Sequence, residues 1–353
     1  MDQERARLGE GGSIYVNELT IAPSDLWSSQ YKEFHAATAG VNAVDFGARI
    51  PARTAPKADW DKFDAWVDEF YNARPLARVL DRYPADVQDT HLAGVRVGII
   101  TPKREISRPG CVLINLHGGS FVFNRGLSYG LLEAVPVAVC SGMKVVTLDY
   151  RQAPFHSYPA ATEDVEAVYT QLLKQYRPQS IGIFGCSAGA ALTSQALARF
   201  QSTGLPRPGA ISMSAFAPPP PWIPPPSGHG WGDSGIWFSG LPKSELSDAD
   251  QVRLRPMEWY MESARLDDPQ AYPGSSDSVL AKFPPTLLLT GTRDFTMSTV
   301  VVAHARLVRL GVVAALYIME GARHAAHVMA VGTPEAHDAH AYIAHWLCDH
   351  LEQ

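Results

Sequence analysis

The chain has 353 residues, 46% of them hydrophobic, which is enough to bury a substantial core in one large domain or two modest ones. Its formal net charge is −6 and it has no basic run, so we exclude nucleic acid as a partner. No apolar stretch reaches the ~20 residues that cross a bilayer, so we expect no stable membrane association. The N-terminus lacks a secretory signal and the four cysteines are scattered, so we expect a cytoplasmic protein.

Residues 1–88 are predicted to form helices and loops, and from about residue 90 short apolar runs alternate with helix-like segments. The runs are apolar throughout, as in strands that are buried on both faces. The sequence therefore predicts an α/β fold in which helices cover both faces of a mostly parallel sheet. The predicted strands lie at 95–100, 111–116, 144–148, 180–184, 210–213, 285–290 and 315–319. The predicted helices lie near 127–141, 160–176, 188–203, 298–311 and 334–350.

A long insertion at residues 216–275 interrupts this alternation and begins with FAPPPPWIPPPSGHGWGDSGIWF. Its proline runs favour extended backbone over helix. The insertion is either a surface loop or part of a cap. In the second case it covers a site together with the N-terminal segment, and Trp222 and Trp237 line a pocket there. We divide the chain into a cap segment (1–88), a core domain (89–215 and 276–353) and the insertion (216–275) as a second part of the cap.

The stretch Gly185-Cys186-Ser187-Ala188-Gly189 has the pattern G-x-S-x-G and lies between a predicted strand and an Ala-rich predicted helix. In that setting the chain turns sharply, which strains the serine backbone and exposes its Oγ at the C-terminal edge of the sheet. The free N–H groups at the start of the following helix favour negative charge there. The pattern predicts that Ser187 is a nucleophile, and the alternative is a glycine-rich turn with an idle serine.

The sequence HGGS at residues 117–120 follows another predicted strand. Glycines allow a loop to direct its N–H groups at the negative oxygen that develops during acyl transfer. We predict that these donors are the N–H groups of Gly118 and Gly119, with Ala188 as a third. His117 is expected to brace the loop, and the alternative for the whole motif is a tight turn that ends the strand.

The base and acid that would serve this serine are expected after it in the chain, the acid first. His324 follows the last predicted strand and Asp294 follows the strand before it, so we predict that His324 is the base and that Asp294 orients it. His327 is the competing base. Nothing nearby completes a metal site with the two histidines, so no metal is predicted. Three other acids do not follow a predicted strand and rank lower: Asp267, Asp268 and Asp277.

Four stretches together resemble the hormone-sensitive-lipase family of α/β-hydrolases, whose bacterial members are carboxylesterases. They are HGGSF at 117–121, DYRQAPFHSYPAATED at 149–164, GCSAGA at 185–190 and the paired loops GTRD and EGARH. The resemblance spans roughly residues 90–350. It implies the α/β-hydrolase fold with an eight-stranded sheet, a helical cap, no cofactor and hydrolysis of short- to medium-chain esters. It also implies the roles given above for Ser187, Asp294 and His324, and bracing roles for Asp149, Arg151, Glu163 and Asp164.

Three positions depart from the family pattern. Ser120 stands where a third glycine is usual, and Ala190 where a glycine is usual. Cys186 replaces the usual aspartate, which removes a negative charge and a hydrogen-bond acceptor beside Ser187. Ser120 and the adjacent Phe121 are also candidate substrate contacts.

These observations predict a serine carboxylesterase that acts on a small-molecule ester through an acyl-enzyme. Two alternatives stay open: an acyltransferase or amidase with the same three residues, and a ligand-binding protein on the same fold. The presence of His324 weighs against the second, because a binding protein does not need the base. A homodimer is also left open.

Overall fold

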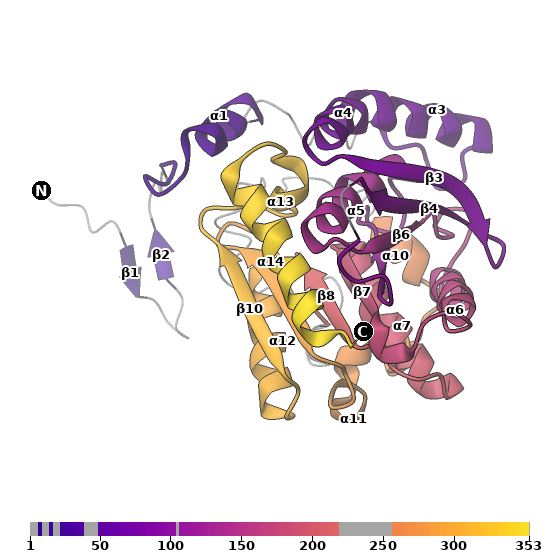
Figure 1. Cartoon of the computed structure of the whole chain (residues 1–353). Coiled ribbons are helices and arrows are strands. Elements are labelled where there is room, and N and C mark those ends of the chain that lie inside the picture. The colour runs from indigo at the N-terminus through magenta and orange to yellow at the C-terminus, as the bar shows by residue number, and fades with distance from the viewer. Residues whose placement is uncertain are drawn as a thin grey trace, which may run out of the picture.

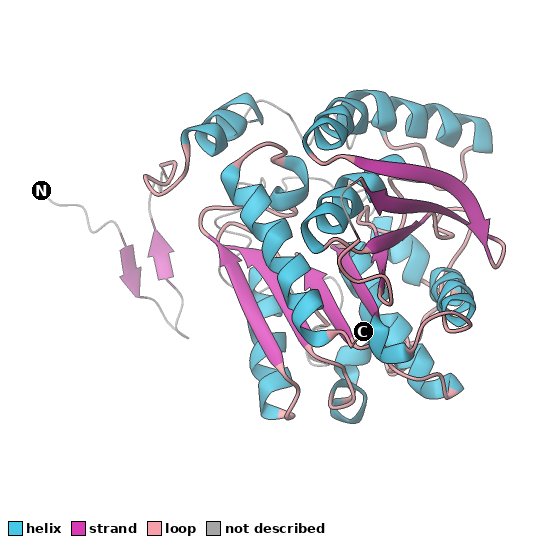
Figure 2. Ribbon diagram, in the orientation of Figure 1, coloured by secondary structure: helices cyan, strands magenta, loops and turns pink. Residues whose placement is uncertain are grey.

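The computed structural model describes residues 6–8, 14–16, 22–38, 49–103, 106–218 and 256–352. An eight-stranded sheet runs through this part of the chain in the order β10-β9-β8-β7-β5-β6-β4-β3, with helices on both faces (Figures 1 and 2). The six strands β5 to β10 are parallel, whereas β4 runs antiparallel to its neighbours. The predicted fold, a mostly parallel sheet of eight strands, is thereby confirmed.

The strands of this sheet have the following bounds: β3 (Ala85–Leu92), β4 (Val95–Pro102), β5 (Val112–Leu116), β6 (Lys144–Leu148), β7 (Ile181–Cys186), β8 (Ala210–Ser214), β9 (Thr286–Gly291) and β10 (Ala314–Met319). The central strands β5, β7, β8 and β9 are buried along their whole length. Burial on both faces explains why each of these strands reads as a continuous apolar run.

The sheet begins earlier than the sequence predicts. Strand β3 pairs with β4 along its whole length, so the predicted boundary at residue 88 falls inside a strand. The sequence of β3, ADVQDTHL, is mostly polar because this strand lies at the edge of the sheet and is largely exposed. Strand β3 therefore lacks the apolar run that indicates a buried strand.

Five helices of the core lie within a few residues of their predicted positions: α5 (Ser128–Ser141), α6 (Ala160–Leu172), α7 (Ala188–Thr203), α12 (Met297–Arg309) and α14 (Pro334–His350). Helices α5 and α14 pack together over one face of the sheet, and α6, α7 and α12 contribute to a second apolar core on the other face. The start of α14 is capped, because the Thr333 side chain accepts the N–H of Ala336.

The remaining elements are shorter. They are β1 (Ala6–Leu8) and β2 (Ile14–Val16), which pair antiparallel, α1 (Ser29–Thr38), α3 (Lys57–Val67), the π-helical turn η2 (Asp68–Asn72), α4 (Ala73–Arg82), α10 (Pro256–Met261), α11 (Asp277–Leu280) and α13 (Ala326–Met329), with 3₁₀ turns η3 (Pro178–Ser180) and η4 (Pro273–Ser275). Among the described residues no helix has the length and apolar content needed to span a bilayer. Trp222 and Trp237 lie outside the described residues.

The N-terminal helices are packed into the core of the protein. In Figure 1, α3 and α4 lie beside strand β3 at the end of the sheet. Trp60 and Phe63 of α3 are buried in the same apolar cluster as Phe121 and Tyr260. Trp27, just before α1, is buried in the cluster on the opposite face of the sheet. This segment is therefore part of the folded unit.

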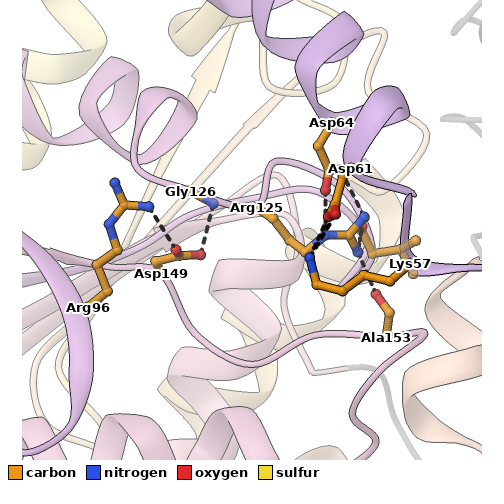
Figure 3. A network of polar contacts seen from close by, with 9 residues as sticks. Lys57, Asp61, Asp64, Arg96, Arg125, Gly126, Asp149 and Ala153 are labelled. Carbon is orange, nitrogen blue, oxygen red and sulfur yellow. Dashed lines mark hydrogen bonds and ion pairs between the residues drawn. The ribbon is translucent and has the colours of Figure 1, made fainter. Parts of the chain in front are cut away.

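An ion pair joins helix α3 to the segment that follows the HGGS sequence (Figure 3). Arg125 donates from Nε and Nη2 to the two carboxylate oxygens of Asp64, at 2.7 and 2.8 Å. Its Nη1 donates to the carbonyl oxygens of Val122 and Ala153, both at 3.0 Å. Burial raises the pKa of Asp64 and Arg125 opposes that rise. The guanidinium thus holds a helix and two loops together.

The bracing role implied for Asp149 is seen in the same network. Its Oδ1 accepts the N–H of Gly126 at 2.8 Å, and its Oδ2 lies 3.6 Å from Nη1 of Arg96 on β4 (Figure 3). The segment 122–126 is therefore held on one side by helix α3 and on the other by the ends of strands β4 and β6.

We predict that Asp64→Asn lowers the free energy of unfolding by about 1–3 kcal/mol, because it leaves the half-buried Arg125 without its counter-ion. Asp61→Asn is the matched control on the same helix. Asp61 pairs with an exposed Lys57 at 2.7 Å, so its loss changes stability by less than about 0.5 kcal/mol. Urea unfolding of both variants measures the difference, and equal losses would contradict the anchoring role of Arg125.

Candidate active site

Ser187 lies at the sharp turn between strand β7 and helix α7. Its backbone has φ 55° and ψ −117°, a conformation that residues other than glycine rarely adopt. Its N–H donates to the carbonyl oxygen of Ser214, at the end of β8, at 2.8 Å. A Cβ on Gly189 would overlap the carbonyl oxygen of Leu116, so only glycine fits where α7 passes β5. The strained strand–turn–helix predicted for the G-x-S-x-G pattern is present.

Three side chains from separate loops meet at this turn. His324, after β10, places Nε2 2.9 Å from the Oγ of Ser187 and Nδ1 2.8 Å from Oδ1 of Asp294, which follows β9. The structure therefore brings together the serine, histidine and aspartate that the sequence singled out. In this arrangement the imidazole can take the serine proton while the carboxylate stabilises the positive ring.

Asp294 is kept ionised although it is only 1% exposed. Burial alone would raise its pKa, but His324 and the N–H and hydroxyl of Thr296 outweigh burial, so the pKa is lowered. Thr296 donates to Oδ1 from its N–H at 2.9 Å and from its Oγ1 at 2.8 Å. Sequence reasoning missed this residue, although an Asp followed two positions later by a hydroxyl residue is a common local hydrogen-bonding pattern.

The prediction for Gly118 needs a correction. Its N–H donates to Oε1 of Glu133 at 2.9 Å, so it is not available to a substrate oxygen. Gly118 instead packs against the nucleophile, since a Cβ at this position would lie 3.4 Å from the Cβ of Ser187. The partner that takes its N–H is on helix α5, and nothing in the HGGS motif indicates it.

The N–H groups of Gly119 and Ser120 come next in the loop. Gly119 has φ +132° and Ser120 has φ +55°, so the backbone reverses here. Within the described ranges, neither N–H has an acceptor, whereas the Gly119 carbonyl accepts from Val122 and Phe123. Ala188, at the first position of α7, also has an N–H without an intrahelical partner. These three N–H groups belong to the HGGS loop and to the turn at Ser187.

His117 braces the loop as predicted. Its ring is fully buried, stacks on Tyr150 with centroids 4.4 Å apart, and places Nδ1 2.8 Å from the carbonyl oxygen of Gly118. Burial lowers the pKa of His117, so the ring is neutral at physiological pH and its Nδ1–H donates to that carbonyl. The Tyr150 hydroxyl in turn donates to the His117 carbonyl at 2.6 Å.

The bracing roles implied for Arg151, Glu163 and Asp164 are also seen. Arg151 Nε donates to Oδ1 of Asp164 at 2.8 Å, and its Nη2 donates to Glu163 at 3.1 Å. The N–H of Arg151 donates to the second Asp164 oxygen at 2.8 Å. These contacts fix the loop after β6 to the start of helix α6.

Of the predicted substrate contacts, Phe121 is corrected. Its side chain is fully buried and stacks on Tyr260 with centroids 4.5 Å apart, so it packs the core beneath the loop. Ser120 is only partly buried.

His327, the competing base, does not reach the nucleophile. It is buried in α13, and burial lowers its pKa to about 4. Its ring lies 5.5 Å from that of His340 on α14, and both rings line a small cavity with Glu133 and Cys186. Among the described residues, no group of three or more His, Cys, Asp or Glu side chains is placed to hold a metal ion.

This fold and this arrangement of serine, histidine and aspartate define an α/β-hydrolase. A family model described as alpha/beta hydrolase fold matches residues 113–328, and the chain belongs to that family.

Solved structures and curated relatives agree with this assignment. The crystal structure of esterase E25 has a TM-score of 0.79 and 27% identity, and the match covers 96% of this chain and 99% of that chain. An esterase from the bacterial hormone-sensitive lipase family has a TM-score of 0.71 at 22% identity, over 92% of this chain and 99% of that chain, and shares the fold. The α/β-hydrolase fold implied by the resemblance is therefore confirmed.

An acetyl-hydrolase of Streptomyces hygroscopicus is 35% identical over 127 residues, which is 35% of this chain and 42% of the relative. The chain thus spans about two fifths of the length of the first curated relatives that it matches.

We predict that Glu133→Gln changes how stability depends on pH. Burial raises the pKa of Glu133 to about 8, against hydrogen bonds from Gly118, Asn115 and Cys186 that lower it. Because the folded pKa exceeds the ordinary value of 4.5, this group's contribution to stability is full below that value and is lost as pH rises through about 8.

The variant lacks this titration. Relative to it, the wild type therefore loses on the order of 2–4 kcal/mol of unfolding free energy between about pH 5 and pH 8. His327 and His340 titrate in both proteins, so their effects cancel in the comparison. Urea unfolding of both proteins at about pH 5 and pH 8 measures the difference in their unfolding free energies. If that difference is the same at both pH values, the pKa of Glu133 is not raised.

Proposed function

We propose that the protein is a carboxylesterase that hydrolyses short- to medium-chain carboxylic esters through an acyl-enzyme on Ser187. The observation that carries the proposal is the continuous hydrogen-bonded chain from Ser187 Oγ through His324 to Asp294, with spacings of 2.9 and 2.8 Å. The names of the relatives, esterase and acetyl-hydrolase, support an ester as the substrate.

In the first half of the reaction, His324 Nε2 takes the proton of Ser187 as Oγ attacks the ester carbonyl. Asp294 fixes the ring through Nδ1–H and stabilises the imidazolium. The carbonyl oxygen becomes negative and accepts N–H groups, for which we propose those of Gly119, Ser120 and Ala188. Donors of this kind contribute about 10²–10³-fold each. His324 then gives its proton to the leaving alcohol, and the acyl group stays on Ser187.

In the second half, water replaces the alcohol. His324 takes a proton from the water as it attacks the acyl carbonyl, the same N–H groups hold the negative oxygen, and the proton returns to Ser187 Oγ when the acid leaves. The hydrogen-bonded His324 favours this catalytic cycle over simple ligand binding, because binding alone does not require an aligned base.

We predict that Ser187→Ala lowers kcat for p-nitrophenyl butyrate by at least about 10³-fold, because the acyl-enzyme cannot form. Circular dichroism and thermal unfolding check that the variant is folded. A fluorophosphonate probe is expected to label the wild type and not the variant. Undiminished turnover by folded Ser187→Ala would refute the proposed nucleophile.

We predict that His324→Gln loses turnover to a similar extent, whereas His327→Gln keeps kcat within about tenfold of the wild type. Glutamine matches histidine in polarity but cannot act as the base. His327 is the matched control because it lies three residues further along the same segment and is buried. The opposite ranking of the two variants would assign the base to His327.

A further inference from the structure

A buried acid on helix α5 lies against the HGGS loop. Glu133 is 3% exposed, and its Oε1 accepts the N–H of Gly118 at 2.9 Å. We propose that Glu133 is a positioning residue for ester hydrolysis, because it holds the HGGS loop where the N–H groups of Gly119 and Ser120 can reach the substrate oxygen. This inference rests on the proposed function.

The acid is itself anchored to the central sheet. Its Oε2 accepts from Nδ2 of Asn115 on β5 at 3.1 Å, and Oδ1 of Asn115 accepts the hydroxyl of Thr147 on β6 at 2.7 Å. All three side chains are buried. A chain of hydrogen bonds therefore runs from two adjacent strands, through Glu133, to a backbone N–H of the loop.

The anchored group lies next to the nucleophile. A Cβ on Gly118 would lie 3.0 Å from the carbonyl oxygen of Cys186 and 3.4 Å from the Cβ of Ser187. A shift of Gly118 therefore moves the two following N–H groups relative to Ser187. A misplacement of about 1 Å at a reacting group can cost about 10²-fold in rate.

The other anchors of this loop hold carbonyl groups, so they cannot replace Glu133. Tyr150 donates to the His117 carbonyl, and the His117 ring and Asn124 donate to the Gly118 carbonyl at 2.8 and 3.2 Å. If the acceptor at residue 133 is removed, the Gly118 N–H is left buried without a partner. A buried N–H without an acceptor destabilises this position of the loop, and the loop can relieve the loss by shifting.

The surroundings of Glu133 favour its neutral form. The titratable groups around it are buried or partly buried, and burial shifts each of their pKa values toward the neutral form: Tyr129 on α5, Tyr150 after β6, Cys186 on β7, His327 on α13 and His340 on α14. Burial also raises the pKa of Glu133, to about 8. Glutamine is therefore the closest substitute at neutral pH, since it keeps an acceptor oxygen at the same reach.

The test compares variants that keep, move or remove this acceptor. At pH 7, Glu133→Gln is expected to keep kcat for p-nitrophenyl butyrate within about threefold of the wild type. Glu133→Met, of similar length without an acceptor, and Glu133→Asp, which withdraws the carboxyl by one methylene, are expected to lose about 10- to 100-fold in kcat. KM is expected to change by less than about twofold, because the displaced N–H groups act mainly in the transition state.

Val137→Ala is the matched control. Val137 lies one turn further along α5 and lines the same cavity with a buried apolar side chain. Its truncation is expected to lower the melting temperature while kcat stays within about twofold. If kcat of Val137→Ala falls as far as that of Glu133→Met, the effect comes from general loosening of the helix and the proposal is overturned.

Two further results would also overturn it: full activity of Glu133→Met, or Glu133→Gln as inactive as Glu133→Met. If Glu133→Met does not fold, the test rests on Glu133→Asp. Full activity of Glu133→Asp would then overturn the proposal, because it would show that the short contact with Gly118 is not needed. Ser187→Ala in the same assay separates the two proposals. An active Ser187→Ala refutes the esterase mechanism, whereas an inactive one with an active Glu133→Met refutes only the role of Glu133.

Discussion

The close approach of helix α7 to the end of strand β5 shapes the whole site. Gly189 has no room for a Cβ against the Leu116 carbonyl, so the helix begins immediately over the sheet edge. The chain reaches it from β7 only through the strained backbone of Ser187, which points Oγ out of the sheet. The loop after β5 also lies against the serine, because Gly118 packs closely against Cys186 and Ser187. The nucleophile and the loop that would hold the oxyanion are therefore set by one packing contact.

Two buried carboxyl groups at this edge have pKa values shifted in opposite directions. Asp294 accepts from His324 and twice from Thr296, and these donors keep it ionised against burial. Glu133 also accepts hydrogen bonds, but burial dominates and favours the neutral acid. The two charge states match the groups that lie next to each acid. The negative charge of Asp294 stabilises a positive imidazole, whereas a negative charge at Glu133 would oppose the oxyanion that forms nearby.

The sequence predicted those parts of the site that depend on local pattern and chain order. Ser187 was found from its strand–turn–helix setting, and Asp294 and His324 from their places after the last two strands, because parallel strands bring their carboxyl ends to one edge. The assignment of Gly118 failed because its partner is 15 residues away on an apolar helix, where a lone Glu133 gives no pattern. Strand β3 was missed for a related reason, since an exposed edge strand does not need an apolar run.

The loop and the segment after it are held at two ends by different physical means. Glu133 anchors the near end inside the protein, where water and salt do not screen the contact. Arg125 anchors the far end to Asp64 of helix α3, and both side chains keep some exposure, 17% and 21%. Salt therefore weakens the far anchor more than the near one. A change in helix α3 would reach the segment at 122–126 first, while the N–H groups beside Ser187 stay tied to the sheet through Glu133.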